Sequence, residues 1–174
     1  MTPEIPRILT AILPGYALSP WGIHGVVHWA RVMENGLKLA EVTKADPRIV
    51  ALFALFHDSR RLNDGDDPEH GLRGAELALE LRGEYFELPD DAFELLYRAC
   101  ECHTIGRSDP NITVLTCWDS DRLDLGRVGI MPSPKYLCTD YGRTSKMIEW
   151  ANTRALADYE PEFVSHWNLA ERTW

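Results

Sequence analysis

Apolar residues along this chain recur at helical spacing, and this periodicity limits the possible fold more than any other feature. Within residues 21–42 the apolar side chains follow one another four, three, four and three positions apart, at Val26, Ala30, Met33, Leu37 and Ala40. That spacing places them on one face of an α-helix. The alternating pattern of a half-buried strand is almost absent. The sequence therefore predicts an all-α fold.

Carboxylate and proline residues mark where other helices begin. Asp46 followed by Pro47 combines an N-cap side chain with a proline suited to the first helical turn. Asp67 followed by Pro68 repeats this signal. The segments that we expect to be helical are 21–42, 47–61, 68–81, 90–106 and 112–125, with one or two further helices after residue 142.

Length and composition fit one helical domain. The chain has 174 residues, of which 45% are hydrophobic, and no segment has the composition of a linker, so we expect a single domain over 1–174. The longest strongly apolar run, 49–56, is far shorter than the roughly 18 residues that span a bilayer. The four cysteines form no CxxC pair, and the N-terminus does not resemble a secretion signal. We therefore expect no membrane partner, free thiols and a cytoplasmic location.

The charge balance argues against a nucleic-acid partner. The chain carries 18 Lys and Arg against 27 Asp and Glu, a net charge of -9, and it has no run of five basic residues. A protein that binds a nucleic-acid polymer needs a basic face to displace counterions. A small anionic substrate remains compatible, because a bound metal supplies local positive charge that the total conceals.

Histidines carry the main chemical signal. His57 and Asp58 stand side by side at the end of a buried helix, and together an imidazole and a carboxylate can hold one divalent cation or bridge two. Alone, this pair occurs by chance in many proteins, and a histidine at a helix C-terminus is its ordinary explanation. Four more side chains come from other expected helices: His28, His70, His103 and Asp121. Several buried imidazoles would each need a separate hydrogen-bond partner, so metal ligation is the more economical account.

At these positions the sequence resembles the HD-domain superfamily of metal-dependent phosphohydrolases, whose pattern is a His, a His-Asp pair and a later Asp on a helical bundle. The resemblance covers about 21–129 and is carried by His28-Trp-Ala-Arg-Val, Phe56-His57-Asp58 and Asp121-Arg122-Leu123. It implies an HD-type helical bundle with the metal site in the core between helices. Beyond it lies a C-terminal helical extension, about 130–174, which we expect to cover the pocket mouth or to form a homodimer contact.

Two further motifs, around His70-Gly71 and His103-Thr-Ile-Gly-Arg107, are similar to the HD subgroup that holds two metals, including the bacterial HD-type diadenosine tetraphosphate hydrolases. In that arrangement Asp58 bridges two ions. His28, His57 and Asp121 lie mainly on one ion, and His70 and His103 on the other. Asp119 competes with Asp121 for the last position, and only the family register favours Asp121. The mixed imidazole and carboxylate set suits divalent transition metals such as iron or manganese.

Other polar residues near these motifs are candidates for catalysis or substrate binding. His24 lies one helical turn before His28 and can donate a proton to a leaving oxygen, support the ligands or serve as a further ligand. A partly buried histidine at a helix start explains it equally well. Arg61, Arg107 and Arg122 are candidates for substrate phosphates, since a guanidinium can bind phosphate through two hydrogen bonds. A solvated surface arginine is the alternative for each.

The resemblance implies a metal-dependent phosphohydrolase that acts on a small phosphorylated substrate, with a nucleotide as the favoured class. Metal-activated water would attack the phosphoryl group, and Asp58 would be the central catalytic carboxylate. Two alternatives stay open. One is a di-iron oxygenase, because a few HD-fold proteins use the same ligand set to activate oxygen. The other is a non-enzymatic regulatory module that binds a ligand without turnover.

Overall fold

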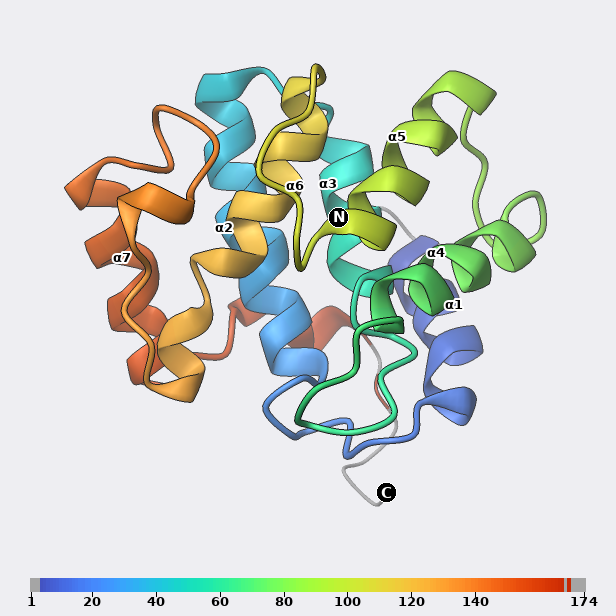
Figure 1. The fold of residues 1–174 in the computed structure, drawn as a ribbon. Coiled ribbons are helices and arrows are strands. Elements are labelled where there is room, and N and C mark those ends of the chain that lie inside the picture. The colour runs from blue at the N-terminus through green and yellow to red at the C-terminus, as the bar shows by residue number, and fades with distance from the viewer. Residues whose placement is uncertain (1–3, 168, 170–174) are drawn as a thin grey trace.

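Helices joined by turns make up residues 4–167 and 169, the part of the chain that this computed structural model describes (Figure 1). The α-helices are α1 (Glu4–Ile12), α2 (Val26–Thr43), α3 (Pro47–Phe56), α4 (His70–Leu81), α5 (Asp90–Cys102), α6 (Ile112–Arg122) and α7 (Ser145–Leu156). Short 3-10 helices are η1 (Leu13–Gly15), η2 (Leu125–Val128), η3 (Pro134–Tyr136) and η4 (Glu162–Trp167). Within the described residues no strand forms, and Arg82 and Phe86 make an isolated bridge. The prediction of an all-α fold is confirmed.

Helix α3 is the centre of the core. Asp46 caps its N-terminus, where one carboxylate oxygen accepts hydrogen bonds from the backbone N–H groups of Arg48 (2.8 Å) and Ile49 (3.4 Å). From residue 49 to residue 56 every side chain except that of Ala51 is buried. The helix packs against α2, α4, α5 and α6. This explains why its sequence is apolar nearly all round.

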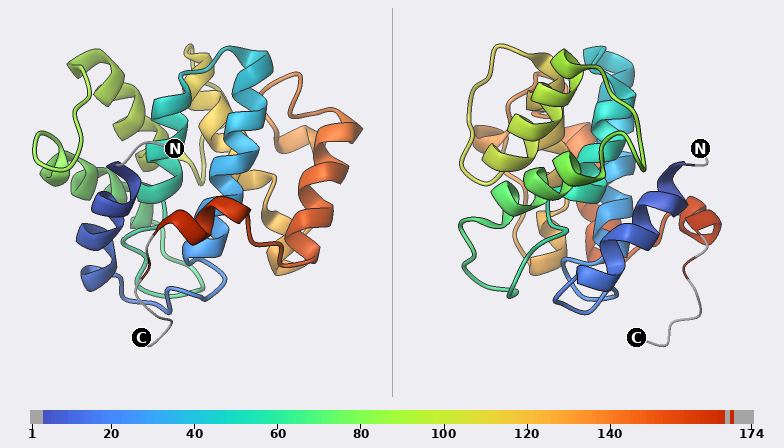
Figure 2. Two further views of the ribbon diagram at one scale, coloured as in Figure 1. Left: turned by 180° about the vertical axis from the view of Figure 1, so that it is seen from behind. Right: turned by 90° about the vertical axis from the view of Figure 1, so that its right-hand side faces the viewer.

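The other helices surround α3 in a bundle. α2 lies along it, and α6 contacts both of them. α4 and α5 pack against each other on one side, while α7 and η2 pack together on the other side, beyond α2 (Figure 1). The view from behind in Figure 2 shows α1 and η4 together across the back of the bundle. The helix ends that carry histidine or aspartate thereby meet near the middle of the molecule.

The expected helices are shorter than their sequence patterns suggest, as α2 and α3 show. α2 begins at Val26 instead of residue 21, because the preceding residues form tight turns. Gly25 is required there, since a Cβ atom would lie 2.2 Å from the carbonyl oxygen of Pro20. α3 ends at Phe56 instead of residue 61. The Ser59 hydroxyl donates a hydrogen bond to the Phe56 carbonyl (2.8 Å), and the chain turns at this point.

The Asp67-Pro68 pair does not begin a helix, contrary to the prediction. α4 begins at His70, and the Asp67 carboxylate instead accepts hydrogen bonds from the backbone N–H of Leu62 (2.8 Å) and from Arg73 (2.6 Å). The helix expected over 90–106 ends four residues early, at Cys102, and the helix expected over 112–125 ends three residues early, at Arg122. The sequence analysis did not predict α1, whose buried residues are Ile5, Ile8, Leu9 and Ile12.

Helix α7 adds a second apolar cluster to the main core. This cluster joins α7 to the ends of α2 and α6 and consists of Leu39, Leu123, Leu137, Met147, Ile148 and Ala151. Residues 137–151 therefore cover one flank of the bundle. No helix in the described part of the chain has the length and apolarity needed to cross a membrane.

We predict that Asp46→Ala lowers the free energy of unfolding by about 1 kcal/mol, because the first turn of α3 loses its side-chain acceptor. Urea denaturation measures the change. Asp140→Ala is the matched control, since the Asp140 carboxylate is fully exposed and lies 3.9 Å from its nearest partner, Arg143. The control should stay within about 0.5 kcal/mol of the parent. Equal stability of the two variants would contradict the capping role.

Candidate metal centre

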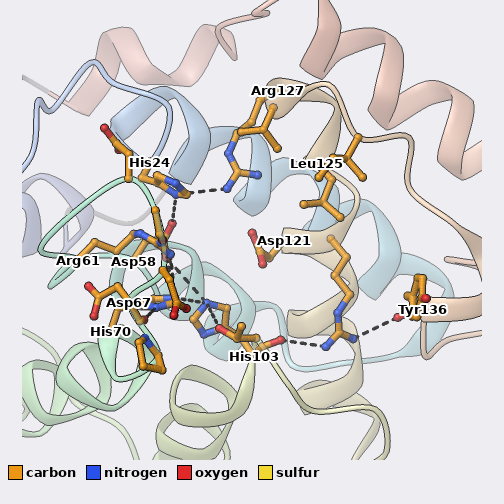
Figure 3. A pocket seen from close by; sticks show the side chains of 18 of the residues that line it. His24, Asp58, Arg61, Asp67, His70, His103, Asp121, Leu125, Arg127 and Tyr136 are labelled. Atoms are coloured by element: carbon orange, nitrogen blue, oxygen red, sulfur yellow. Dashed lines mark hydrogen bonds and ion pairs between the residues drawn. The ribbon is translucent and has the colours of Figure 1, made fainter.

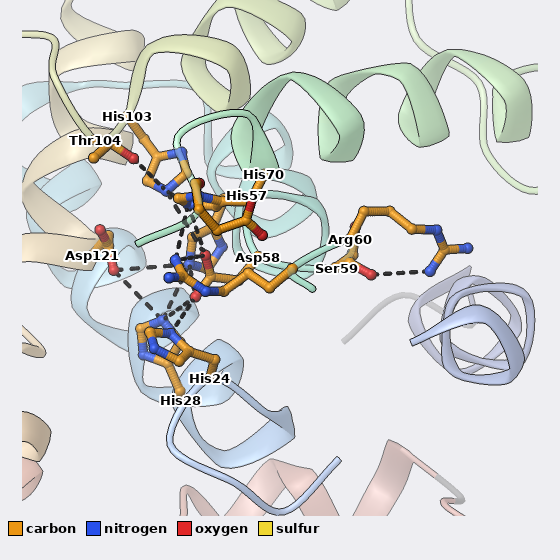
Figure 4. Close-up of polar contacts among 12 residues, drawn as sticks. His24, His28, His57, Asp58, Ser59, Arg60, His70, His103, Thr104 and Asp121 are labelled. Carbon is orange, nitrogen blue, oxygen red and sulfur yellow. Dashed lines mark hydrogen bonds and ion pairs between the residues drawn. The ribbon is translucent and has the colours of Figure 1, made fainter. Parts of the chain in front are cut away.

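Buried imidazoles and carboxylates from separate helices meet beside the C-terminus of α3 (Figure 4). His57 and Asp58 occupy the turn directly after α3, where the early end of the helix aims both side chains inward. The other members are His24 before α2, His28 on α2, His70 at the start of α4, His103 directly after α5, and Asp121 near the end of α6. The structure thus brings together all the residues that the sequence analysis proposed as metal ligands.

One group of possible ligands consists of His28, His57 and Asp121. The Nε2 atoms of His28 and His57 are 3.1 Å apart, and Asp121 Oδ1 lies 3.5 Å and 3.8 Å from them. For comparison, two nitrogen ligands about 2.1 Å from one ion and at right angles would be roughly 3.0 Å apart. The spacing of this group is therefore that of ligands around one ion.

A second group consists of Asp58, His70 and His103. The Nε2 atoms of His70 and His103 are 2.9 Å apart, and Asp58 Oδ1 is 3.2 Å from the first and 3.8 Å from the second. The other oxygen, Asp58 Oδ2, faces the first group and lies 3.5 Å from His28 Nε2. Asp58 therefore stands between the two groups with one oxygen toward each, as Figure 4 shows.

The hydrogen bonds of the imidazoles fix which nitrogen carries the proton. Nδ1 of His57 lies 3.2 Å from the carbonyls of Phe53 and Ala54, and Nδ1 of His103 lies 2.7 Å from the Cys100 carbonyl. His70 Nδ1 makes the same kind of contact with the Asp67 carbonyl. A carbonyl only accepts, so each Nδ1 donates and each Nε2 presents a lone pair.

This protonation pattern points to a cation. Burial lowers the pKa of His57 to about 3 and also lowers that of His103, so both rings are neutral near pH 7. His57 Nε2 lies 3.1 Å from His28 Nε2, and His103 Nε2 lies 2.9 Å from His70 Nε2, which Arg61 Nη1 also approaches (3.1 Å). A metal ion that accepts Nε2 lone pairs removes the repulsion between them, and neutral imidazole is the form that binds metal. The donor set therefore fits a divalent metal.

The two central carboxylates are ionised. Burial alone would raise the pKa of Asp121, but surrounding groups, Arg127 among them, more than offset burial and lower it to about 2. The pKa of Asp58 is likewise held well below its usual value by the imidazoles around it, although burial opposes its ionisation. Two buried negative charges among neutral rings call for positive charge at the same place.

Asp119 and Asp121, the two candidates for the last ligand position, point in different directions. The fully buried Asp119 carboxylate accepts hydrogen bonds from Cys138 N (2.6 Å), Thr139 N (2.8 Å) and Thr139 Oγ1 (2.7 Å). It thereby fixes the loop after η3. Asp121 faces the imidazoles, so the geometry places Asp121, not Asp119, in the cluster.

Sequence reasoning missed a buried pair behind His28. Asp124 Oδ2 accepts from His28 Nδ1 (2.7 Å), and Arg31 Nε donates to Asp124 Oδ1 (2.7 Å). A carboxylate at this position fixes the ring orientation and the tautomer of a ligand histidine. Arg31 belongs to the first-helix motif, and Asp124 lies one turn after Asp121. The sequence did not indicate that the two would meet.

His24 lies at the edge of the cluster. Its Nδ1 is 2.9 Å from Asp58 Oδ2, and its backbone carbonyl accepts a hydrogen bond from the Tyr16 hydroxyl (2.8 Å). Together with His28 and Asp58 it forms a third possible ligand group. All three of its suggested roles, proton donor, support for the ligands and further ligand, are compatible with this position.

A cavity of about 590 Å³ opens over the cluster (Figure 3). Three arginines that the sequence analysis proposed for substrate binding line it, Arg61, Arg107 and Arg122, and so does Arg127, which that analysis did not single out. Arg127 approaches His24, with Nη2 3.4 Å from His24 Nδ1. No spacing rule in the sequence marks Arg127, which is brought to the cavity by the short helix η2.

Arg122 has a structural role in addition to lining the cavity. Its Nη1 donates to the Tyr136 carbonyl (3.3 Å) and to Cys138 Sγ (3.2 Å). Its Nη2 donates to the carbonyls of His103 (2.9 Å) and Gly106. These bonds tie the turn that carries His103 to the segment that carries Tyr136, and they occupy the terminal N–H groups that a phosphate would need.

We predict that Asp124→Asn weakens Mn²⁺ binding by roughly 10- to 100-fold, because His28 loses the charged acceptor that orients it. Calorimetric titration of the metal-free protein measures the affinity. Asp109→Asn is the matched control, since Asp109 is a buried carboxylate paired with Arg98 (2.7 Å) away from the cluster. Unchanged affinity in Asp124→Asn would show that Asp124 does not orient the ligand.

Asp119→Asn and Asp121→Asn should separate stability from metal binding. We expect Asp119→Asn to lower the free energy of unfolding by about 1–3 kcal/mol, because its amide group would face N–H donors, and to leave metal affinity unchanged. Asp121→Asn should weaken metal binding and leave the free energy of unfolding nearly unchanged. Urea denaturation and metal titration of both variants test this, and reversed effects would place Asp119 in the cluster.

Comparison with known proteins agrees with this geometry. No protein-family model and no curated protein matches the chain. Among solved structures, a crystal structure at 1.45 Å resolution of a predicted HD superfamily hydrolase from an uncultured Thermotogales bacterium is similar, with a TM-score of 0.64 and 26% sequence identity. The match covers 94% of this chain and 91% of the other. The chain has an HD-type helical fold, and this similarity together with the His and Asp clusters supports a metal-dependent hydrolase.

Proposed function

We propose that this protein is a phosphohydrolase with two metal ions and that its substrate is a small phosphorylated compound, most simply a nucleotide. The observation that carries the proposal is the position of Asp58. Its two oxygens face separate histidine groups at the floor of an arginine-lined cavity. A carboxylate shared in this way is the arrangement expected of a bridging ligand.

Each ion would have its own ligands. His28, His57 and Asp121 would hold one, His70 and His103 would hold the other, and Asp58 would be shared. Iron or manganese suits the mixed nitrogen and oxygen donors. When bound, the two ions supply a water made nucleophilic near neutral pH and positive charge for the phosphoryl oxygens.

Arginines in the cavity give the chain its own means of holding phosphate. Arg61 Nη1 lies 3.4 Å from Asp58 Oδ1, and the carbonyls of Asn63 and Gly65 hold the guanidinium at the cluster. The exposed Arg107 donates only to carbonyls of its own turn, from Nη1, so its other N–H groups can bind an anion. We assign phosphate binding to Arg61, Arg107 and Arg127.

His24 is the residue that we assign to proton transfer. It lines the cavity beside Asp58, and Asp58 and Arg127 contact its Nδ1 from two sides. Imidazole is a common general acid, and from this position His24 would deliver a proton to a leaving oxygen. In this proposal Asp58 orients the ring as well as binding metal.

The proposal predicts that phosphate release requires both metal and Asp58. Chelation should abolish release of phosphate from p-nitrophenyl phosphate and nucleoside monophosphates, and Mn²⁺ or Fe²⁺ should restore it. Asp58→Ala should lower kcat/KM by more than the roughly 10- to 100-fold loss typical of residues that only support metal ligands. Colorimetric phosphate assays measure both effects.

Asp140→Asn serves as the control, because its carboxylate is exposed and does not line the cavity. It should retain full activity. Turnover that survives chelation, or that is unchanged in Asp58→Ala, would contradict the proposed function.

A further inference from the structure

Large apolar side chains gather at one end of the cavity. Val128, Ile130 and Tyr136 are 39%, 54% and 49% exposed, and they line the cavity together with Leu125. Apolar surface that is open to water inside a concave site is characteristic of ligand binding. We call this set, Leu125, Val128, Ile130 and Tyr136, the apolar wall.

The apolar wall lies away from the imidazoles. Figure 3 shows Leu125 and Tyr136 on the far side of Asp121 from His24 and Arg61. The cavity therefore has an ionic end and an apolar end. Its volume of about 590 Å³ lies in the roughly 300–1,000 Å³ range of small-molecule sites and leaves space beyond a phosphate group.

The wall is held in place by buried polar contacts. Asp119 accepts two backbone hydrogen bonds and one hydroxyl bond from Cys138 and Thr139, directly after the wall residue Tyr136. Arg122 donates to the carbonyl of Tyr136 itself (3.3 Å). This segment is thus fixed from its buried side, while the Tyr136 ring stays half exposed.

The planar side chains of Arg107 and Tyr136 lie near each other in the cavity lining. The Arg107 guanidinium lies 5.5 Å from the centre of the Tyr136 ring. Guanidinium planes and tyrosine rings both stack well on aromatic rings, and a stacked guanidinium can still donate hydrogen bonds to phosphate from its edge. A ligand with an aromatic ring stacked on this pair and a phosphate at the ionic end would occupy both ends of the cavity.

We propose that the apolar wall and Arg107 bind a planar aromatic group in the alcohol portion of the substrate, with Tyr136 as the specificity-determining residue. The substrates would then be phosphate esters whose alcohol carries a planar ring. This inference rests on the proposed phosphohydrolase function, because the wall and the candidate metal centre share one cavity.

A pair of ligands with the same ester bond tests the proposal. AMP and ribose 5-phosphate differ in the presence of a planar base and share the phosphorylated 5′ carbon. We expect the Mn²⁺-loaded protein to bind AMP at least about tenfold more tightly than ribose 5-phosphate by calorimetry. Tyr136→Ala should bring the two dissociation constants within about twofold of each other, whereas Tyr136→Phe should keep the preference.

Leu79→Ala is the matched control, because Leu79 is 54% exposed on α4 and does not line the cavity. Its preference for AMP should equal that of the parent. Equal binding of the two ligands, binding of neither, or a preference that survives Tyr136→Ala would overturn the proposal. So would tighter binding of hexyl phosphate than of AMP, which would identify an aliphatic site.

The hydrolysis assays keep this result separate from the proposed function. Metal-dependent phosphate release without a preference that depends on Tyr136 would overturn only the aromatic subsite. A Tyr136-dependent preference in binding, without metal-dependent hydrolysis of any ester, would overturn only the phosphohydrolase function.

Discussion

The mutual approach of imidazoles around Asp58 is the constraint on which the rest of this structure depends. Backbone carbonyls accept hydrogen bonds from Nδ1 of His57, His70 and His103, and the Asp124 carboxylate accepts one from Nδ1 of His28. The remaining Nε2 lone pairs then converge in two pairs, 2.9 Å and 3.1 Å apart. The convergence of lone pairs and carboxylates costs free energy, and bound cations would offset this cost. The large apolar core built on α3 provides the stability that lets the fold hold it.

Much of the fold could be predicted from local sequence, and the candidate ligand set from short motifs that resemble those of the HD superfamily. Apolar periodicity indicates where helices lie. At the end of a buried helix, the side chains of an adjacent His-Asp pair have few possible orientations. Helix ends were less predictable, since they depend on turns such as those at Gly25 and Ser59, which tertiary contacts select. α1 was missed altogether.

The hydrogen-bond partners that support the candidate ligands and the cavity loop could not be predicted from the sequence. The Asp124 bond to His28 joins residues 96 positions apart, and the Asp119 bonds to Thr139 form only after the loop folds back. Charge alone does not separate the roles of Arg122 and Arg127 either. Both guanidinium groups donate to backbone carbonyls, but Nη2 of Arg122 binds the carbonyls of His103 and Gly106, whereas Nη2 of Arg127 approaches His24 in the cavity. These differences arise from packing, which leaves no spacing rule in the sequence.

The metal content of the purified protein tests the central claim most directly. Protein expressed without an affinity tag and purified without chelator would be analysed by elemental mass spectrometry, alongside a His70→Ala/His103→Ala double variant. The account predicts about two equivalents of iron or manganese, falling to about one in the variant, because only the second group loses its imidazoles. Protein that holds almost no metal, and takes up none when Mn²⁺ or Fe²⁺ is added, would contradict it.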